Sequence, residues 1–142
     1  MERSPFMSEH HHYGYTLRTT LGVAEAITAV TAALKTEGFG VLTTIDVQST
    51  LRQKLNLERN PYIILGACNP QLVSEALEVE PELGLLLPCN VIVYTDANGD
   101  TVVSAIDPEV LFTVVRRADL TALAQEVGVR LQRVLAQLPG VV

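Results

Sequence analysis

Two β-branched runs joined by a short loop place the strongest constraint on the fold of this chain. Val91–Tyr94 and Thr101–Ile106 each have the length of a strand, and Asp96–Asp100 separates them. Asn98 and Gly99 within that loop suit the positive φ angles of a tight hairpin. The two runs are therefore predicted to pair as neighbouring strands, and the rest of the chain must build a sheet around them.

The other predicted elements mix helices with strands. Val23–Glu37 repeats apolar residues at helical spacing, and the last helix carries a leucine-rich stripe that runs from a cap at Asp119 to Leu138. The apolar run Tyr62–Ala67 is expected to be a strand buried on both faces. The remaining predicted elements are strands at Tyr13–Thr19 and Gly40–Val47, short helices at Gln48–Leu55 and Asn69–Glu78, and a loop or single turn at Pro81–Pro88.

This order predicts an α+β fold with a single-layer, mostly antiparallel or mixed sheet of about five strands and helices packed on one face. The expected core is β-α-β-β-β-β-α-like, with short extra helices. Residues 1–12 are predicted to be a polar N-terminal tail, and residues 13–142 a single α+β domain. The length of 142 residues and the apolar content of 48% are typical of one packed domain.

Charge excludes two classes of partner. The net charge is −6, and Lys35 and Lys54 are the only lysines. Nucleic acids and anionic membrane surfaces are bound by clustered basic residues, so neither is expected as a partner.

No apolar run reaches the roughly 20 residues that span a bilayer, and Met1–Gly14 lacks the apolar core of a signal peptide. The expected location is the cytoplasm, where two cysteines are normally thiols.

Two Cys-Asn steps, Cys68-Asn69 and Cys89-Asn90, are the densest chemical feature of the chain. Each lies at a predicted strand boundary, and the helix between them can return both cysteines to the same end of the sheet. Cys68 also precedes a predicted helix N-terminus, where the helix dipole favours a thiolate. One interpretation is a reactive thiol pair or two ligands of a soft metal. The other is two small buried apolar side chains. Zinc sites usually contain close pairs such as Cys-x₂-Cys, which this chain lacks.

The two asparagines and Asp46 have structural interpretations beside functional ones. Asn69 followed by Pro70 is typical of a helix start, because Asn caps the helix and Pro at the first position loses no hydrogen bond. Asn90 either satisfies a turn or, with Asn69, lines a polar pocket beside the thiols. Asp46 ends an apolar strand, where partial burial would raise its pKa. Capping of the helix that begins near Gln48 is its favoured role.

Histidine-dependent catalysis is not expected in the core. The three histidines, His10, His11 and His12, lie in the predicted tail. A native metal role for this run is not favoured, because a site needs several fixed ligands. The chain also lacks the nucleotide-binding, phosphate-binding, serine-hydrolase and zinc-protease motifs. No catalytic residue and no cofactor is assigned, and the chain is not expected to be an enzyme.

Five segments carry a resemblance to a known family: Glu37–Leu42, Ile45–Val47, Ile64–Pro70, Gly84–Val91 and Ala105–Pro108. Together they resemble the domain-of-unknown-function 302 family (DUF302) over about Tyr15–Leu138, and the two Cys-Asn segments are the most specific part. The resemblance implies a TATA-binding-protein-like α+β fold, often paired as a homodimer, and no established activity. A shared fold does not make the chain a DNA binder. Thr44 and Ile63 stand where the family has an acidic and a basic residue, which weakens any polar site at those positions.

The leading hypothesis is a homodimeric ligand-binding or sensing domain without catalysis, with a small molecule as ligand. Its pocket is predicted to be walled by polar side chains at strand ends, namely Asp46, Cys68, Asn69, Cys89 and Asn90. One alternative is a thiol-based redox protein, or a metal- or haem-handling protein, that uses Cys68 and Cys89. Another is a structural protein-interaction module with the apolar loop Leu83–Leu87 as its dimer or partner surface.

Overall fold

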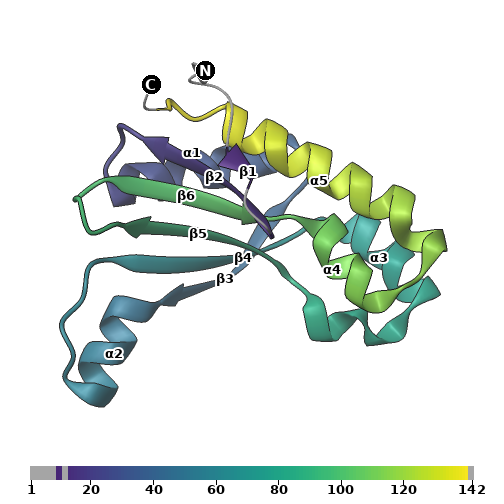
Figure 1. The fold of residues 1–142 in the computed structure, drawn as a ribbon, viewed down its shortest axis with the longest axis horizontal. Coiled ribbons are helices and arrows are strands. Elements are labelled where there is room, and N and C mark those ends of the chain that lie inside the picture. Colours follow the sequence, from purple (N-terminus) through teal and green to yellow (C-terminus); the bar gives the residue numbers. More distant parts are fainter. Residues whose placement is uncertain (1–8, 11–12, 141–142) are drawn as a thin grey trace.

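The sheet of this protein is antiparallel throughout. The computed structural model describes residues 9–10 and 13–140, and within them six strands follow the order β1-β2-β6-β5-β4-β3 (Figure 1). Every neighbouring pair is antiparallel, and β5 and β6 form the predicted hairpin. The α+β class and the sheet of about five strands are confirmed, with a two-residue strand added at one edge. The strands are β1 (Glu9–His10), β2 (Gly14–Thr19), β3 (Gly40–Asp46), β4 (Tyr62–Cys68), β5 (Cys89–Thr95) and β6 (Thr101–Ile106).

The N-terminal tail expected over residues 1–12 is described only at Glu9–His10. Its backbone there pairs with β2, opposite Tyr15 and Thr16. The other tail residues, including His11 and His12 of the histidine run, lie outside the described residues.

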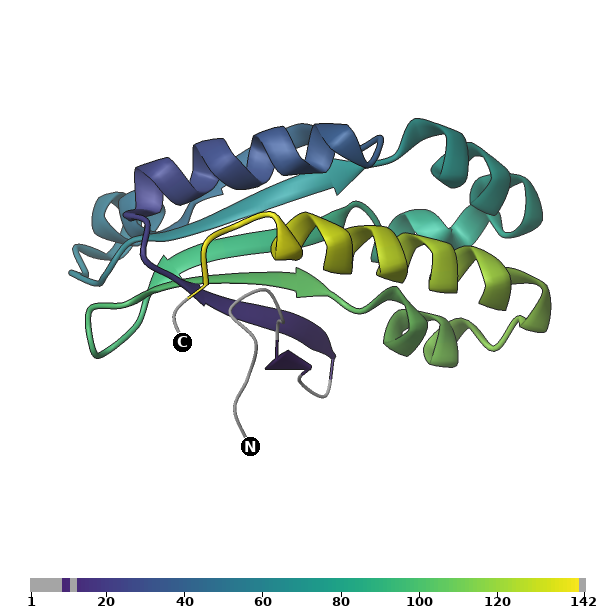
Figure 2. The same ribbon diagram turned by 90° about the horizontal axis from the view of Figure 1, so that it is seen from above.

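Helices α1 (Val23–Thr36) and α5 (Thr121–Ala136) cover one face of the sheet and run side by side (Figure 2). Their inward side chains, such as Val30 of α1 and Leu131 of α5, are completely buried against the strands. The start of α1 is stabilised by Glu25, whose carboxylate accepts a hydrogen bond from the Gly22 N–H at 3.4 Å. Gly38 follows the helix at φ 85°, the left-handed conformation that glycine adopts most easily. None of the helices in the described part of the chain is long and apolar enough to cross a membrane.

The other face of the sheet is not covered in the same way. Leu65 and Ala67 of β4 are buried under the helices, whereas Tyr62 and Ile64 are only half-buried on the other face. The prediction that this strand is buried on both faces was therefore wrong, because the helices pack on one side of the sheet. The Tyr62 and Tyr94 rings stack there with centroids 5.3 Å apart.

Short helices extend the fold beyond one end of the sheet. These are α3 (Pro70–Val79), the 3₁₀ helix η1 (Pro81–Leu86), α4 (Pro108–Val115) and the 3₁₀ turn η2 (Ala118–Leu120). They form a second, smaller hydrophobic cluster around Ala76, Leu83 and Leu120. η1 occupies the segment expected to be a loop or single turn. It is followed by a cis peptide bond between Leu87 and Pro88.

The starts of α4 and α5 differ, and the cap predicted for α5 was wrong. Asp107, which directly follows β6, accepts a hydrogen bond from the Glu109 N–H at 3.0 Å and caps α4. Asp119 does not cap α5, which begins at Thr121 without a side-chain cap. The Asp119 carboxylate instead binds the guanidinium group of Arg117, with an N–O distance of 2.9 Å.

Helix α2 (Val47–Leu55) projects from the other end of the sheet, beside the edge strand β3 (Figure 1). It contains no buried residue. Its start is capped by Asp46, whose Oδ1 accepts a hydrogen bond from the Ser49 N–H at 2.9 Å. The capping role favoured for Asp46 is confirmed, and the side chain is exposed rather than partly buried.

Candidate functional site

Strands β4 and β5 bring the two Cys-Asn steps to the same end of the sheet, as predicted. Ala67 lies opposite Cys89, and Gly66 lies opposite Asn90. Cys68 therefore lies one residue beyond the cross-strand partner of Cys89. Asn69 follows as the N-cap of α3.

The two cysteines belong to opposite faces of the sheet. Successive side chains of a strand alternate between faces, so Cys89 shares the helix-covered face with Ala67. Cys68 and Asn90 belong to the other face, where Cys68 is half-buried and Asn90 is exposed. Both thiols are free. The two sulfurs therefore do not share one site.

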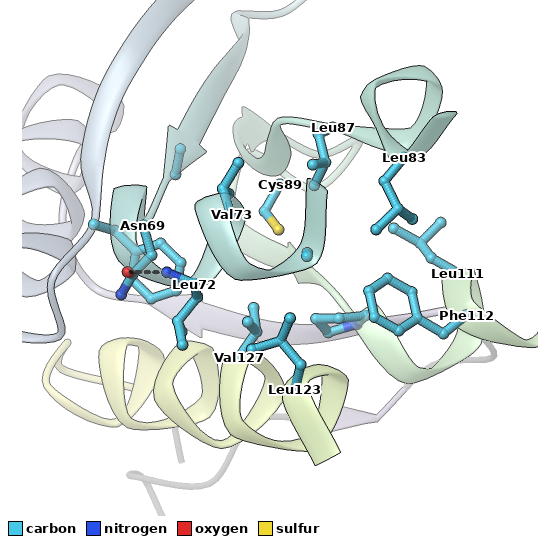
Figure 3. Close-up of a pocket in the computed structure, with 14 residues that line it drawn as sticks. Asn69, Leu72, Val73, Leu83, Leu87, Cys89, Leu111, Phe112, Leu123 and Val127 are labelled. Carbon is cyan, nitrogen blue, oxygen red and sulfur yellow. Dashed lines mark hydrogen bonds between the residues drawn. The ribbon is translucent and has the colours of Figure 1, made fainter. Parts of the chain in front are cut away.

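Cys89 and Asn69 line a small apolar cavity between the end of the sheet and the short helices (Figure 3). The cavity has a volume of about 30 Å³. Val73 of α3 and Leu83 of η1 form one wall, and Phe112 of α4 and Leu123 of α5 form another. Asn69 and Cys89 supply the only polar side chains among its lining residues, all of which are described. The cavity thus lies at the seam between the main core and the smaller cluster.

Asn69 is held in place by two hydrogen bonds of its amide group. Its Oδ1 accepts from the Leu72 N–H at 3.2 Å, and its Nδ2 donates to the Glu37 carbonyl oxygen at 3.3 Å. Arg130 of α5 donates to the same carbonyl oxygen at 3.0 Å. A side chain at Gly38 would bring its Cβ within 2.9 Å of the Asn69 Nδ2. Asn69 therefore links α3 to the C-terminal end of α1, and the predicted cap is confirmed.

Burial makes Cys89 a poor nucleophile. Loss of hydration, with a smaller contribution from Cys68, raises the pKa of the Cys89 thiol to about 11. Burial also raises the pKa of Cys68. Because the thiolate is the form that attacks disulfides and binds metals, both thiols are largely protonated near neutral pH. The dipole of α3 does not produce the low pKa that its position beside Cys68 suggested.

The structure does not bring all the predicted site residues together. Asp46 ends β3, opposite Ile63 near the start of β4, and therefore lies at the far end of the sheet from Cys68. Asn90 lies at the right end but on the other face. Only Asn69 and Cys89 line the cavity. Within the described residues there is no group of three or more His, Cys, Asp or Glu side chains that could hold a metal ion.

The wall residues that α4 contributes, Leu111 and Phe112, were not predicted from the sequence. The signal was present, because Asp107 followed by Pro108 repeats the pattern by which Asn69 and Pro70 predicted the start of α3. The two helix starts lie at the same end of the sheet, and the cavity forms between the helices that follow them.

Comparison with known proteins places the chain in a family. A family model described as domain of unknown function DUF302 matches residues 15–138. The chain is also similar to an uncharacterised conserved DUF302 protein from Bacillus stearothermophilus, whose crystal structure superposes with a TM-score of 0.84. The two chains are 32% identical, and the match covers 90% of this chain and 99% of that one. No curated protein matches the sequence. The chain therefore belongs to the DUF302 family.

Proposed function

We propose that this protein is a non-catalytic binding domain that holds a small apolar group in the cavity beside Cys89 and Asn69. The observation that carries the proposal is the cavity itself, which lies between two hydrophobic clusters and has an almost entirely apolar lining. Ligand sites are typically apolar hollows with a few polar groups that orient the ligand. Here the Cys89 thiol is such a group, whereas both atoms of the Asn69 amide already bind the protein backbone.

The chemistry of the lining favours binding over catalysis. Cys89 is the only titratable side chain among the described residues that line the cavity, and its raised pKa keeps it protonated. The same property gives the thiol-based redox alternative no support, because that chemistry needs a thiolate and a second sulfur within bonding reach.

The size of the cavity defines the ligand. About 30 Å³ is enough for one or two water-sized groups. A methyl group, the end of an alkyl chain or a diatomic molecule fits without rearrangement. A larger ligand requires α3 and η1 to move outward. Such a displacement would signal occupancy at the surface, which is the sensing role in this proposal.

Xenon is a suitable probe, because it occupies apolar cavities without needing hydrogen bonds. We expect xenon to shift the methyl resonances of Val73, Leu83 and Leu123 in heteronuclear NMR spectra. Ala76→Val adds two methyl groups to the lining and is expected to abolish the shifts, whereas Leu123→Ala enlarges the cavity and is expected to admit benzene as well. Shifts that are absent in the wild type, or equal in Ala76→Val, would rule out a binding role for this cavity.

Self-association as a homodimer is a second part of the proposal. It is supported by large apolar side chains on the surface, including Leu42, Leu55 and Leu85, which are 67%, 63% and 82% exposed. Sedimentation equilibrium is expected to give twice the monomer mass of 15.4 kDa. A monomer mass at micromolar concentration would refute it.

The free thiols Cys68 and Cys89 also fit a reducing compartment, so we place the protein in the cytoplasm.

A further inference from the structure

We infer that two copies of this chain pair through the free edge of β3 and the projecting helix α2. This inference rests on the proposed self-association and identifies the surface responsible for it. Within the described residues β3 pairs with β4 alone, so its other side presents backbone N–H and C=O groups that have no neighbouring strand. An antiparallel contact between two β3 edges would join two sheets into one.

The sequence of β3 leaves this edge open to pairing. Gly40–Asp46 contains no Lys and no Pro, the residues that most often block the pairing of edge strands. The bulge between Val41 and Thr43 interrupts the first part of β3 and leaves Leu42 at the surface, 67% exposed, so the regular stretch open to pairing is Thr43–Asp46. The other edge strand, β1, has only two residues and offers a much shorter template.

Helix α2 adds apolar surface beside the same edge. It is nine residues long with no buried residue, and an isolated helix of that length is unstable in water. Leu55 and Leu57 are 63% and 51% exposed, and Ile45 of β3 is 48% exposed. With Leu42, these side chains are four of the nine large apolar residues exposed in the described part of the chain. Contact with a second copy would cover them.

The charges at the two ends of β3 identify the partner as a second copy of this chain. Residues 47–59, which contain α2, carry three basic side chains and one acidic one, a net charge of +2 in a chain of net charge −6. α3 at the other end carries two acidic side chains and no basic one. The basic residues are Arg52, Lys54 and Arg59, and the acidic residues of α3 are Glu75 and Glu78.

A two-fold axis brings these opposite charges together. Figure 1 shows α2 and α3 at opposite ends of the sheet. When two β3 edges pair antiparallel about that axis, the α2 end of each sheet lies beside the α3 end of its partner, and the contact occurs twice. Glu75 and Glu78 are exposed and have no ion pair within the described residues, so they are available to Lys54 of the second copy.

Charge reversal tests this arrangement by sedimentation velocity. We expect Arg52→Glu/Lys54→Glu to weaken the dimer about tenfold or more, because each copy loses attraction at both contacts. Glu75→Lys/Glu78→Lys is expected to do the same. An equimolar mixture of the two variants is expected to restore the dimer, since opposite charges then meet at both contacts of the mixed pair. All four side chains are exposed, and an unchanged far-ultraviolet circular dichroism spectrum of each variant would show that folding is intact.

Leu85→Asp is the matched control, because Leu85 is 82% exposed on η1 and outside the proposed surface. Its dimer is expected to be as stable as the wild type. If the wild type is a dimer and the charge variants do not weaken it, or their mixture does not restore it, the β3–α2 surface is refuted while self-association stands. If Leu85→Asp alone dissociates the dimer, the surface lies on η1. A monomeric wild type refutes both proposals.

Discussion

At the scale of single residues, Asn69 uses both atoms of its amide in a buried position. It is 5% exposed, its oxygen caps α3, and its nitrogen binds the carbonyl group that ends α1. Few other side chains offer an acceptor and a donor on the same short stem. The second asparagine, Asn90, also follows a cysteine. Its side chain is exposed on the other face and makes no comparable contacts.

The two asparagines therefore differ in what they contribute to stability. We expect Asn69→Ala to lower the free energy of unfolding by about 2 kcal/mol, about half from the lost cap and half from the lost hydrogen bond to Glu37. Asn90→Ala is expected to change it by less than about 0.5 kcal/mol. Urea unfolding of both variants measures the difference. Similar values for the two would contradict the role given to Asn69.

The two cysteines are expected to differ in reactivity. Cys68 is half-buried and should react first with Ellman's reagent at pH 8, while Cys89 reacts slowly in the native state. In Cys68→Ser, the remaining slow rate should rise with pH until it levels near the Cys89 pKa of about 11. Two equally fast thiols at pH 8 would contradict the burial of Cys89.

The raised pKa also gives Cys89 an effect on stability at high pH. Its folded-state pKa of about 11 lies above the reference value of 9.0. The protonated thiol therefore stabilises the fold below pH 9, and this contribution is lost as the pH rises toward 11. The thermal unfolding midpoint of the wild type should therefore fall between pH 9 and pH 11. Cys89→Ala should remove the part of this fall that the Cys89 thiol causes, and Cys68→Ala should have a smaller effect.

At the scale of elements, the contact between β3, β4 and the chain before β5 depends on the absence of a side chain at Gly66. A Cβ there would collide with Thr43 Oγ1 and lie 2.8 Å from Pro88 Cγ. We expect Gly66→Ala to destabilise the protein by about 1–3 kcal/mol through this overpacking. Gly40→Ala is the control, because no atom lies within 4 Å of its added Cβ. Thermal unfolding compares the two variants, and an equal loss of stability would contradict overpacking at Gly66 as the cause.

The sequence predicts the structure correctly where short-range chemistry decides it. The hairpin at Asn98-Gly99 and the cap at Asn69 both follow from interactions within a few residues. The prediction that Asp46 and Cys68 line one pocket was wrong. Their distance depends on which ends of the antiparallel strands β3 and β4 meet, and Asp46 lies opposite Ile63 rather than Cys68. The cavity could not be predicted, because it exists only where α3, α4 and α5 converge on the sheet.

At the scale of the whole molecule, the division into two hydrophobic clusters predicts two levels of local stability. The main core contains α1, α5 and the strands, whereas the smaller cluster depends on few buried residues, such as Leu83 and Leu120. Segments with few buried contacts open at lower free energy than the global core. The short helices at the cavity end are thus expected to open while the sheet remains folded.

Native-state hydrogen exchange tests this division. Leu83→Ala is expected to reduce amide protection in α3, η1 and α4 while leaving β4 and β5 unchanged. Leu34→Ala, in the main core, is expected to reduce protection throughout the described chain. A uniform loss in the Leu83 variant would show that the molecule opens as a single unit.

The stacked pair of Tyr62 and Tyr94 gives the protein its own optical reporter. The chain has no tryptophan and four tyrosines, so its near-ultraviolet fluorescence comes from tyrosine alone. The stacked pair lies where β4 begins, just after α2, with the Arg59 guanidinium 5.1 Å from the Tyr62 ring centre. A copy that docks on α2 would alter the surroundings of these rings, whereas xenon in the cavity at the other end would not. Emission intensity can therefore separate the two events in an unlabelled sample.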